Sequence, residues 1–175
     1  MPLAQLRSLI TARENPPTLQ HAARTAIAGA VSLLIARLFR LPEAYWAAIS
    51  TLIVMQSTLG AALPISAQRF AGTALGAALG GVIGAYYPGN AAAFAVGVFV
   101  IGVICAATRV ERAAYRYASI TLAIVMLVAR ANRSYVMALH RFVEVSIGIV
   151  IGLVASAIWP ERLQRSVAES ASPQD

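Results

Sequence analysis

Six apolar stretches follow one another along this chain, separated by short polar turns. They cover residues 19–39, 44–63, 65–87, 91–108, 115–131 and 138–159. A membrane helix needs about 20 residues to cross about 30 Å of hydrocarbon, so the pattern predicts an all-α integral membrane protein with six transmembrane helices. Pro64, Pro88 and Pro160 fall at the predicted helix boundaries, where proline is tolerated. Pro64 can also kink one continuous helix instead of ending it.

The composition agrees with this fold class. Of the 175 residues, 59% are hydrophobic and 12% are charged, whereas a soluble domain is about 45–50% apolar and about 25% charged. One small core cannot hide so many apolar side chains, so lipid must cover part of the surface. The net charge of +7 therefore does not indicate nucleic acid binding. We expect one membrane domain over 1–175, without a signal peptide and with a short cytoplasmic tail at 161–175.

The distribution of arginine predicts the orientation. Six spans put both termini on one side, which would carry nine arginines: Arg7, Arg13, Arg24, Arg69, Arg109, Arg112, Arg116, Arg162 and Arg165. The opposite side would carry five: Arg37, Arg40, Arg130, Arg133 and Arg141. Because basic residues are enriched on the cytoplasmic side, we expect a multi-pass protein of the inner membrane with both termini in the cytoplasm.

The sequence also contains an internal repeat. A shift of 72 residues aligns similar residues of the third and sixth spans: Arg69-Phe70 with Arg141-Phe142, Gly76 with Gly148, Gly80 with Gly152, Gly84 with Ser156, and Tyr87-Pro88 with Trp159-Pro160. A shift of 71 aligns 47–55 with 118–126. Three helices per copy is an odd number, so the second copy (about 91–160) would enter the membrane from the side opposite to the first (about 19–88). This predicts an inverted 3+3 repeat, as in many transporters; the alternative is convergence, because apolar helices with glycines align easily.

Small residues recur at every fourth position in the third and sixth spans. They are Gly72, Gly76, Gly80 and Gly84 in the third span, and Gly148, Gly152 and Ser156 in the sixth. Membrane helices associate through close backbone packing, which small residues allow. We therefore expect these two spans to form a tight central pair, within one subunit or across a dimer.

Two matching arginines, Arg69 and Arg141, lie about one turn inside their spans. An arginine near the middle of a membrane helix costs about 2.5–3.5 kcal/mol, whereas one near a helix end reaches the headgroups at little cost. Two interpretations stay open. Either both side chains snorkel to the headgroups, or both face a water-filled cavity, one from each side of the membrane, and bind a substrate anion there.

Polar residues beside these arginines extend the candidate site. His140 and Glu144 are four residues apart and share a helix face. They are the pair that we assign to proton coupling, while the simpler interpretation of Glu144 is a salt bridge to an arginine. In the first span, His21 and Arg24 also share a face, and Arg24 is assigned to substrate binding.

The second span turns polar near its end, at Gln56 and Ser57. Both side chains can offer neutral donors to a bound anion, and we assign them to substrate binding; the alternative is hydrogen bonding between helices. At the start of the same span, Tyr45 and Trp46 are expected to be interfacial anchors. Stacking against an aromatic solute is the alternative for these two rings.

A set of motifs in 44–81 and in 140–160 carries a family resemblance. They are Tyr45-Trp46-Ala47, Val54-Met55-Gln56, Leu59-Gly60-Ala61, Arg69, Gly72-Thr73, Gly76 and the closing stretch HRFVEVSIGIVIGLVASAIWP. Over about residues 20–160 the chain resembles the membrane half of the aromatic acid exporter family, also called the fusaric acid resistance family. Plant aluminium-activated malate channels belong to the same superfamily.

The resemblance implies export or conduction of organic anions, often aromatic carboxylates, through bundles of six-helix units. It also implies that membrane arginines attract the anion, a role that Arg69 and Arg141 would have here. Many relatives carry a large cytoplasmic domain after the six helices, and some duplicate the whole unit. Since this chain stops at residue 175, we expect a complete pathway to need a homo-oligomer, most simply a dimer.

The expected function is thus a membrane exporter or channel-like pathway for small organic anions, aromatic ones among them. The alternative is a non-transporting membrane subunit whose glycine-rich helices serve assembly. An enzyme is not expected, because no nucleophile has a base beside it. No cofactor or metal is expected either, since the sequence has no cluster of metal ligands.

Overall fold

The computed structural model describes residues 19–55, 59–128 and 134–159. Within these ranges the chain consists of six α-helices and one π-helix, with no strand. The elements are α2 (Leu19–Leu38), α3 (Tyr45–Val54), α4 (Leu59–Tyr86), α5 (Ala91–Ala107), α6 (Arg112–Ala123), η1 (Ile124–Val128) and α7 (Ser134–Ile158). Each predicted apolar stretch carries one α-helix, which confirms the all-α prediction.

The boundary between the second and third helices differs from the prediction. Helix α3 ends at Val54 and α4 begins at Leu59, so Pro64 lies inside α4 and the predicted helix end there is wrong. Proline lacks the N–H that would bond to the carbonyl four residues earlier, which here belongs to Gly60. Because Gly60 is near the beginning of α4, the helix loses one early bond and continues.

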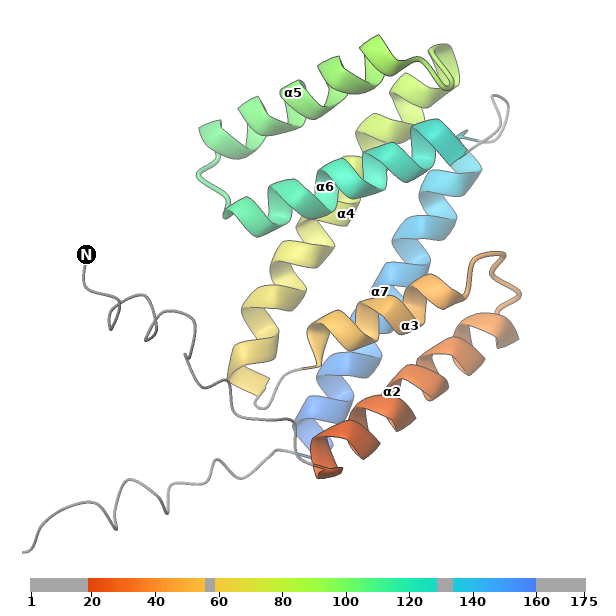
Figure 1. The fold of residues 1–175 in the computed structure, drawn as a ribbon, viewed down its shortest axis with the longest axis vertical. Helices are drawn as coiled ribbons and strands as arrows, with labels where there is room; N and C mark the ends of the chain where they lie inside the picture. The colour runs from red at the N-terminus through yellow and green to blue at the C-terminus, as the bar shows by residue number, and fades with distance from the viewer. Residues whose placement is uncertain (1–18, 56–58, 129–133, 160–175) are drawn as a thin grey trace, which may run out of the picture.

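Helices α4 and α7 pack against each other and connect the two ends of the fold drawn in Figure 1. Helices α5 and α6 pack together over one end of this pair, and α2 and α3 pack together over the other end. The middle helix of each predicted copy crosses to the other copy: α3 packs on α7, and α6 packs on α4. The two halves of the chain are therefore interlocked and do not form separate bodies.

Glycines allow these crossed helices to touch. A Cβ atom placed on Gly76 of α4 would lie 2.2 Å from the Ala118 carbonyl oxygen of α6. A Cβ atom placed on Gly148 of α7 would likewise lie 2.2 Å from the Ala47 carbonyl oxygen of α3. Both distances are far inside van der Waals contact, so the backbones can approach only because glycine has no side chain.

Three of the other glycines in these two rows follow the same division. Their nearest neighbours are Ala114 for Gly72, Val125 for Gly80 and Val54 for Gly152, whereas Gly84 is nearest to Ser134 of α7. Apart from Gly84, the glycine row of α4 thus faces α6 and η1, and the glycine row of α7 faces α3. The two rows do not face each other along their length, as was expected. A central α4–α7 pair does exist, but larger side chains contribute to it, including Phe70 and Phe142, whose ring centroids are 5.1 Å apart.

Helices α2 and α5 end in the same way. Arg40 and Arg109, just beyond them, have positive φ angles of 54° and 53°. After each arginine, the next N–H donates to the carbonyl five residues earlier, at 3.1 and 3.0 Å. This bond satisfies a carbonyl of the last turn and stops the helix.

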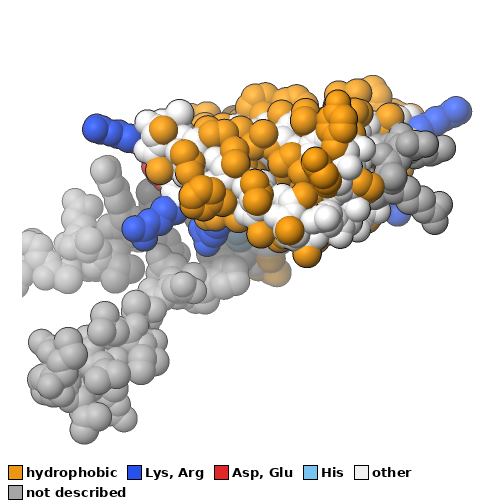
Figure 2. Space-filling view, turned by 90° about the horizontal axis from the view of Figure 1, so that it is seen from above, with side chains coloured by type: hydrophobic (Ala, Val, Ile, Leu, Met, Phe, Trp, Pro, Cys, Tyr) orange, Lys and Arg blue, Asp and Glu red, His pale blue; other side chains and the backbone are white. Residues whose placement is uncertain are grey.

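The outer surface is strongly apolar. Large hydrophobic side chains are exposed on every α-helix. In Figure 2 they cover most of the visible face, while the basic side chains lie toward the two ends of the molecule. Among the described helices, α2 and α7 are both long and apolar enough to cross a membrane, whereas α3 and α5 are apolar but shorter.

Candidate functional site

Arg69 and Arg141 lie inside the helix bundle. Arg69 in α4 is 5% exposed and Arg141 in α7 is 3% exposed. They are near enough for their positive charges to repel each other. Neither side chain reaches the outer surface, so snorkelling to the headgroups does not describe them.

Each of these arginines lies over an aromatic ring from a neighbouring helix. The guanidinium carbon of Arg141 is 3.2 Å from the ring centroid of Trp46 in α3. That of Arg69 is 4.9 Å from the ring centroid of Tyr117 in α6. A cation over a ring face is stabilised by about 0.5–1 kcal/mol at exposed sites and by about 2 kcal/mol when desolvated. The rings therefore offset part of the cost of burying two like charges.

The aromatic partners were not assigned to the site from the sequence. Trp46 was expected to be an interfacial anchor, but its ring is half-buried under Arg141, and its Nε1–H donates to Glu43 Oε2 at 2.9 Å. The shift of 71 residues that aligns the second and fifth spans also aligns Trp46 with Tyr117, and this shared aromatic position was the available signal. Ser50 was missed as well; its Oγ accepts a hydrogen bond from Arg69 Nη2 at 3.1 Å.

A buried carboxylate completes the cluster. Glu144, one turn after Arg141, is 1% exposed, and its Oε1 accepts the Glu43 backbone N–H at 3.0 Å. The second oxygen, Oε2, has no hydrogen-bond partner, and neither do Nε and Nη1 of Arg141 or Nε of Arg69. Buried donors and acceptors are ordinarily satisfied. This cluster therefore holds unused hydrogen-bonding capacity, in three guanidinium nitrogens and one carboxylate oxygen.

Comparison with known proteins places the chain in a family. The sequence pattern of the fusaric acid resistance protein-like family matches residues 27–155. The chain belongs to this family.

One relative with a similar sequence is an inner membrane protein. The inner membrane protein YeeA of Escherichia coli (strain K12) is 26% identical over 144 residues, which make up 81% of this chain and 41% of that protein. The family member described here therefore spans about two-fifths of that relative's length. No solved structure matches it.

Of the proposed coupling pair in this family member, only Glu144 joins the cluster by a described hydrogen bond. His140 lies one turn earlier on α7 and is half-buried. The described hydrogen bonds include none between His140 and Glu144, whereas Glu43 bonds to Glu144 directly. The partner that the sequence analysis missed is thus the backbone N–H of Glu43, at the turn before α3.

Arg24 lies apart from the other arginines. It is 2% exposed, its Nη1 donates to the Trp159 carbonyl, and its Nη2 is 3.3 Å from His21 Nδ1. Arg141 is 18 residues before Trp159, which corresponds to about 27 Å along a helix. Arg24 therefore caps the far end of α7 and is not brought together with the Arg69–Arg141 cluster. Gln56 and Ser57 lie outside the described residues.

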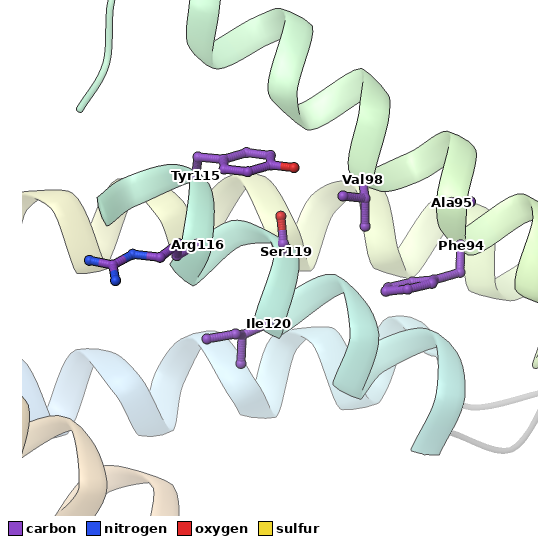
Figure 3. A pocket seen from close by; sticks show the side chains of 7 residues that line it. All are labelled: Phe94, Ala95, Val98, Tyr115, Arg116, Ser119 and Ile120. Atoms are coloured by element: carbon purple, nitrogen blue, oxygen red, sulfur yellow. The ribbon is translucent and has the colours of Figure 1, made fainter. Parts of the chain in front are cut away.

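Two cavities in the described part of the family member lie away from the arginine pair. One, of about 540 Å³, lies between α5 and α6 and is lined by Phe94, Ala95, Val98, Tyr115, Arg116, Ser119 and Ile120 (Figure 3). The other, of about 200 Å³, lies between α2 and α7 beside Arg24 and Trp159. No group of metal-ligating side chains occurs within the described ranges.

Proposed function

We propose that this protein is an inner-membrane exporter or channel-like pathway for small organic anions, aromatic carboxylates among them. Its anion-attracting groups are Arg69 and Arg141. The observation that carries the proposal is that two buried, like-charged arginines keep guanidinium nitrogens without hydrogen-bond partners. Membership of the fusaric acid resistance protein-like family and the inner-membrane relative support the location and the transport class.

The physical reason is the cost of buried donors without acceptors. Guanidinium N–H groups that are buried without hydrogen-bond partners cost free energy, and the like charges of Arg69 and Arg141 repel each other. An organic anion supplies the missing acceptors, because guanidinium groups form strong charge-assisted hydrogen bonds to carboxylates. The rings of Trp46 and Tyr117 lie beside the guanidinium groups. The same site can therefore also contact the apolar or aromatic part of an organic anion.

An inverted 3+3 repeat of six membrane-crossing helices is part of the proposal. Equivalent residues make equivalent contacts: Gly76 with Ala118 and Gly148 with Ala47, and Arg69 with Tyr117 and Arg141 with Trp46. Phe70 and Phe142, themselves equivalent, contact each other, as residues beside a twofold axis would. Such an axis in the membrane plane puts Arg69 and Arg141 on opposite approaches to one centre, with both termini in the cytoplasm. A homo-oligomer, most simply a dimer, would complete the pathway.

Substitution of the two arginines tests the function. We expect Arg69→Gln and Arg141→Gln each to reduce benzoate flux in liposomes about 10- to 100-fold, because a hydrogen bond to a charged group contributes about 1.5–3 kcal/mol. Arg37→Gln, which removes an exposed arginine at the end of α2, is the matched control and should keep wild-type flux.

Two results would contradict the proposal. Equal flux in the Arg69, Arg141 and Arg37 variants would show that the buried pair does not bind the anion. No benzoate flux in any chain, including the wild type, would favour the non-transporting subunit instead. Size-exclusion profiles and thermal unfolding of each variant in detergent establish that a lost flux is not lost folding.

A further inference from the structure

The two equivalent arginine sites differ in one respect. Gly72 of α4 packs closely on Ala114 of α6. The shifts of 72 and 71 residues align these two positions with Glu144 and Glu43, which form a hydrogen bond. One arginine site therefore has the buried carboxylate of Glu144, which accepts the Glu43 backbone N–H, where the other has a close contact between backbones.

Glu144 has a defined hydrogen-bonding state. Its Oε1 is occupied by the Glu43 N–H, its Oε2 has no partner, and the side chain is almost completely buried. Arg141, one turn away, leaves Nε and Nη1 without partners. The two opposite charges attract each other, yet no hydrogen bond between them is among the described contacts. Glu144 thus compensates the charge of Arg141 without using up its donors.

We infer that Glu144 is an internal counter-anion of Arg141, that a substrate carboxylate takes over this role when it binds, and that Glu144 then takes up one proton. The inference rests on the proposed function. The inference adds to the proposed function a coupling between anion binding at Arg141 and protonation of Glu144. The proton would reside on Oε2, since Oε1 already accepts a hydrogen bond.

Charge balance is the physical reason. The titratable and charged groups acting on the Arg141–Glu144 pair are Glu43 just before α3, Tyr45 at its start and Arg69 in α4. On α7 itself, His140 lies one turn before Glu144. In α2, Arg37 is exposed and Arg24 lies at the far end of α7, and η1 has no titratable residue. The positive charges of Arg69 and Arg141 and the negative charges of Glu43 and Glu144 cancel. A bound carboxylate leaves one negative charge in excess, which is costly in a buried site, and one proton restores neutrality.

The test uses Trp46 as a reporter of its stacked neighbour. The chain has two tryptophans, so Trp159→Phe leaves Trp46 alone under the Arg141 guanidinium. Benzoate is titrated into this detergent-solubilised chain between about pH 6 and 8, where a carboxylate probe stays ionised. We expect the affinity to rise as the pH falls, by about tenfold per unit at the alkaline end, where one proton is taken up with each anion, and to level off at the acid end, where Glu144 is already protonated. Binding in weak buffer should remove about one proton from solution per benzoate at the alkaline end.

Glu144→Gln in the same background keeps the shape of the side chain and removes its charge. This variant should bind benzoate at neutral pH as tightly as the parent does at the acid end, with no pH dependence and no proton uptake. Glu111→Gln, which removes an exposed carboxylate hydrogen-bonded to Gln68, is the matched control and should behave as the parent does.

The outcomes separate this inference from the proposed function. Two results overturn the counter-anion role of Glu144 and leave the proposed function standing. One is a parent chain that binds and carries benzoate without proton uptake. The other is a Glu144→Gln variant that keeps the parental pH dependence. A parent chain that neither binds nor carries benzoate overturns both. The proton-uptake measurement needs no variant, so the inference stays testable if Glu144→Gln does not fold.

Discussion

At the residue scale, the feature that distinguishes this protein is a pair of buried arginines resting on aromatic rings. Lysine could not replace them equally, because a planar guanidinium stacks on a ring face and still presents N–H donors at its edge. In this arrangement the ring stabilises the face of the cation while part of its edge stays available. Trp46 under Arg141 is the closer of the two cases, at 3.2 Å.

The role of the ring leads to a prediction about Trp46. We expect Trp46→Leu to lower stability by up to about 2 kcal/mol, the value of a desolvated cation–π contact, and to reduce anion flux because Arg141 loses its support. Trp46→Phe retains a ring and should lose less of both. Thermal unfolding in detergent and benzoate flux in liposomes measure the two effects. Trp159→Leu, at an exposed tryptophan, is the control; equal losses at both tryptophans would contradict the prediction.

At the scale of the helices, the arginine sites depend on how closely α4 and α7 approach their crossed partners. Gly76 and Gly148 bring α6 and α3 into backbone contact. The same helices carry Tyr117 and Trp46. A small displacement of either interface would therefore move a ring away from its arginine.

Adding one methyl group at these contacts tests their importance. Gly76→Ala or Gly148→Ala puts a Cβ at 2.2 Å from a carbonyl oxygen, and overpacking of this kind costs about 1–3 kcal/mol. We expect both variants to unfold at lower temperature than the wild type. Gly60→Ala meets nothing within 4 Å and should be neutral or slightly stabilising, since alanine favours a helix by about 0.8–1.0 kcal/mol over glycine. Similar stability of all three variants would rule out these glycines as close contacts.

At the scale of the whole molecule, an apolar surface lies between two ends that carry arginine (Figure 2). Helix α2 ends and α6 begins at opposite sides of the fold (Figure 1). In an inner membrane, such a body would expose the two ends to different compartments. The proposed topology assigns the end of α2 to the outside and the start of α6 to the cytoplasm.

Cysteine labelling tests that topology. The native thiol, Cys105, is buried and is replaced in a Cys105→Ala background, into which Arg37→Cys or Arg112→Cys is introduced at exposed positions. We expect a membrane-impermeant maleimide to label the cysteine at position 37 in intact cells, and the one at position 112 only after the membrane is opened. Labelling of both in intact cells, or the reverse order, would contradict the orientation.

Much of this protein can be inferred from local sequence. The helices follow from apolar stretches of sufficient length, and the family from short motifs around Arg69. The inverted repeat stays a prediction that equivalent contacts support. Errors arose where a residue's position along a helix decided its effect. Pro64 was expected to end a helix, or else to kink a continuous one; it lies inside α4, near its beginning, where it removes just one bond.

The contacts of the candidate site required three-dimensional packing. Apolar periodicity and glycine spacing are properties of one segment, so they indicate that a helix forms and has a close-packing face. They carry no information about which other segment meets that face. The crossing of α3 onto α7 and of α6 onto α4 brings Trp46 and Tyr117 to the arginines and leaves Arg24 at the far end of α7. These pairings join residues far apart in the chain, and they follow from the close packing that Gly76 and Gly148 allow between the crossed helices.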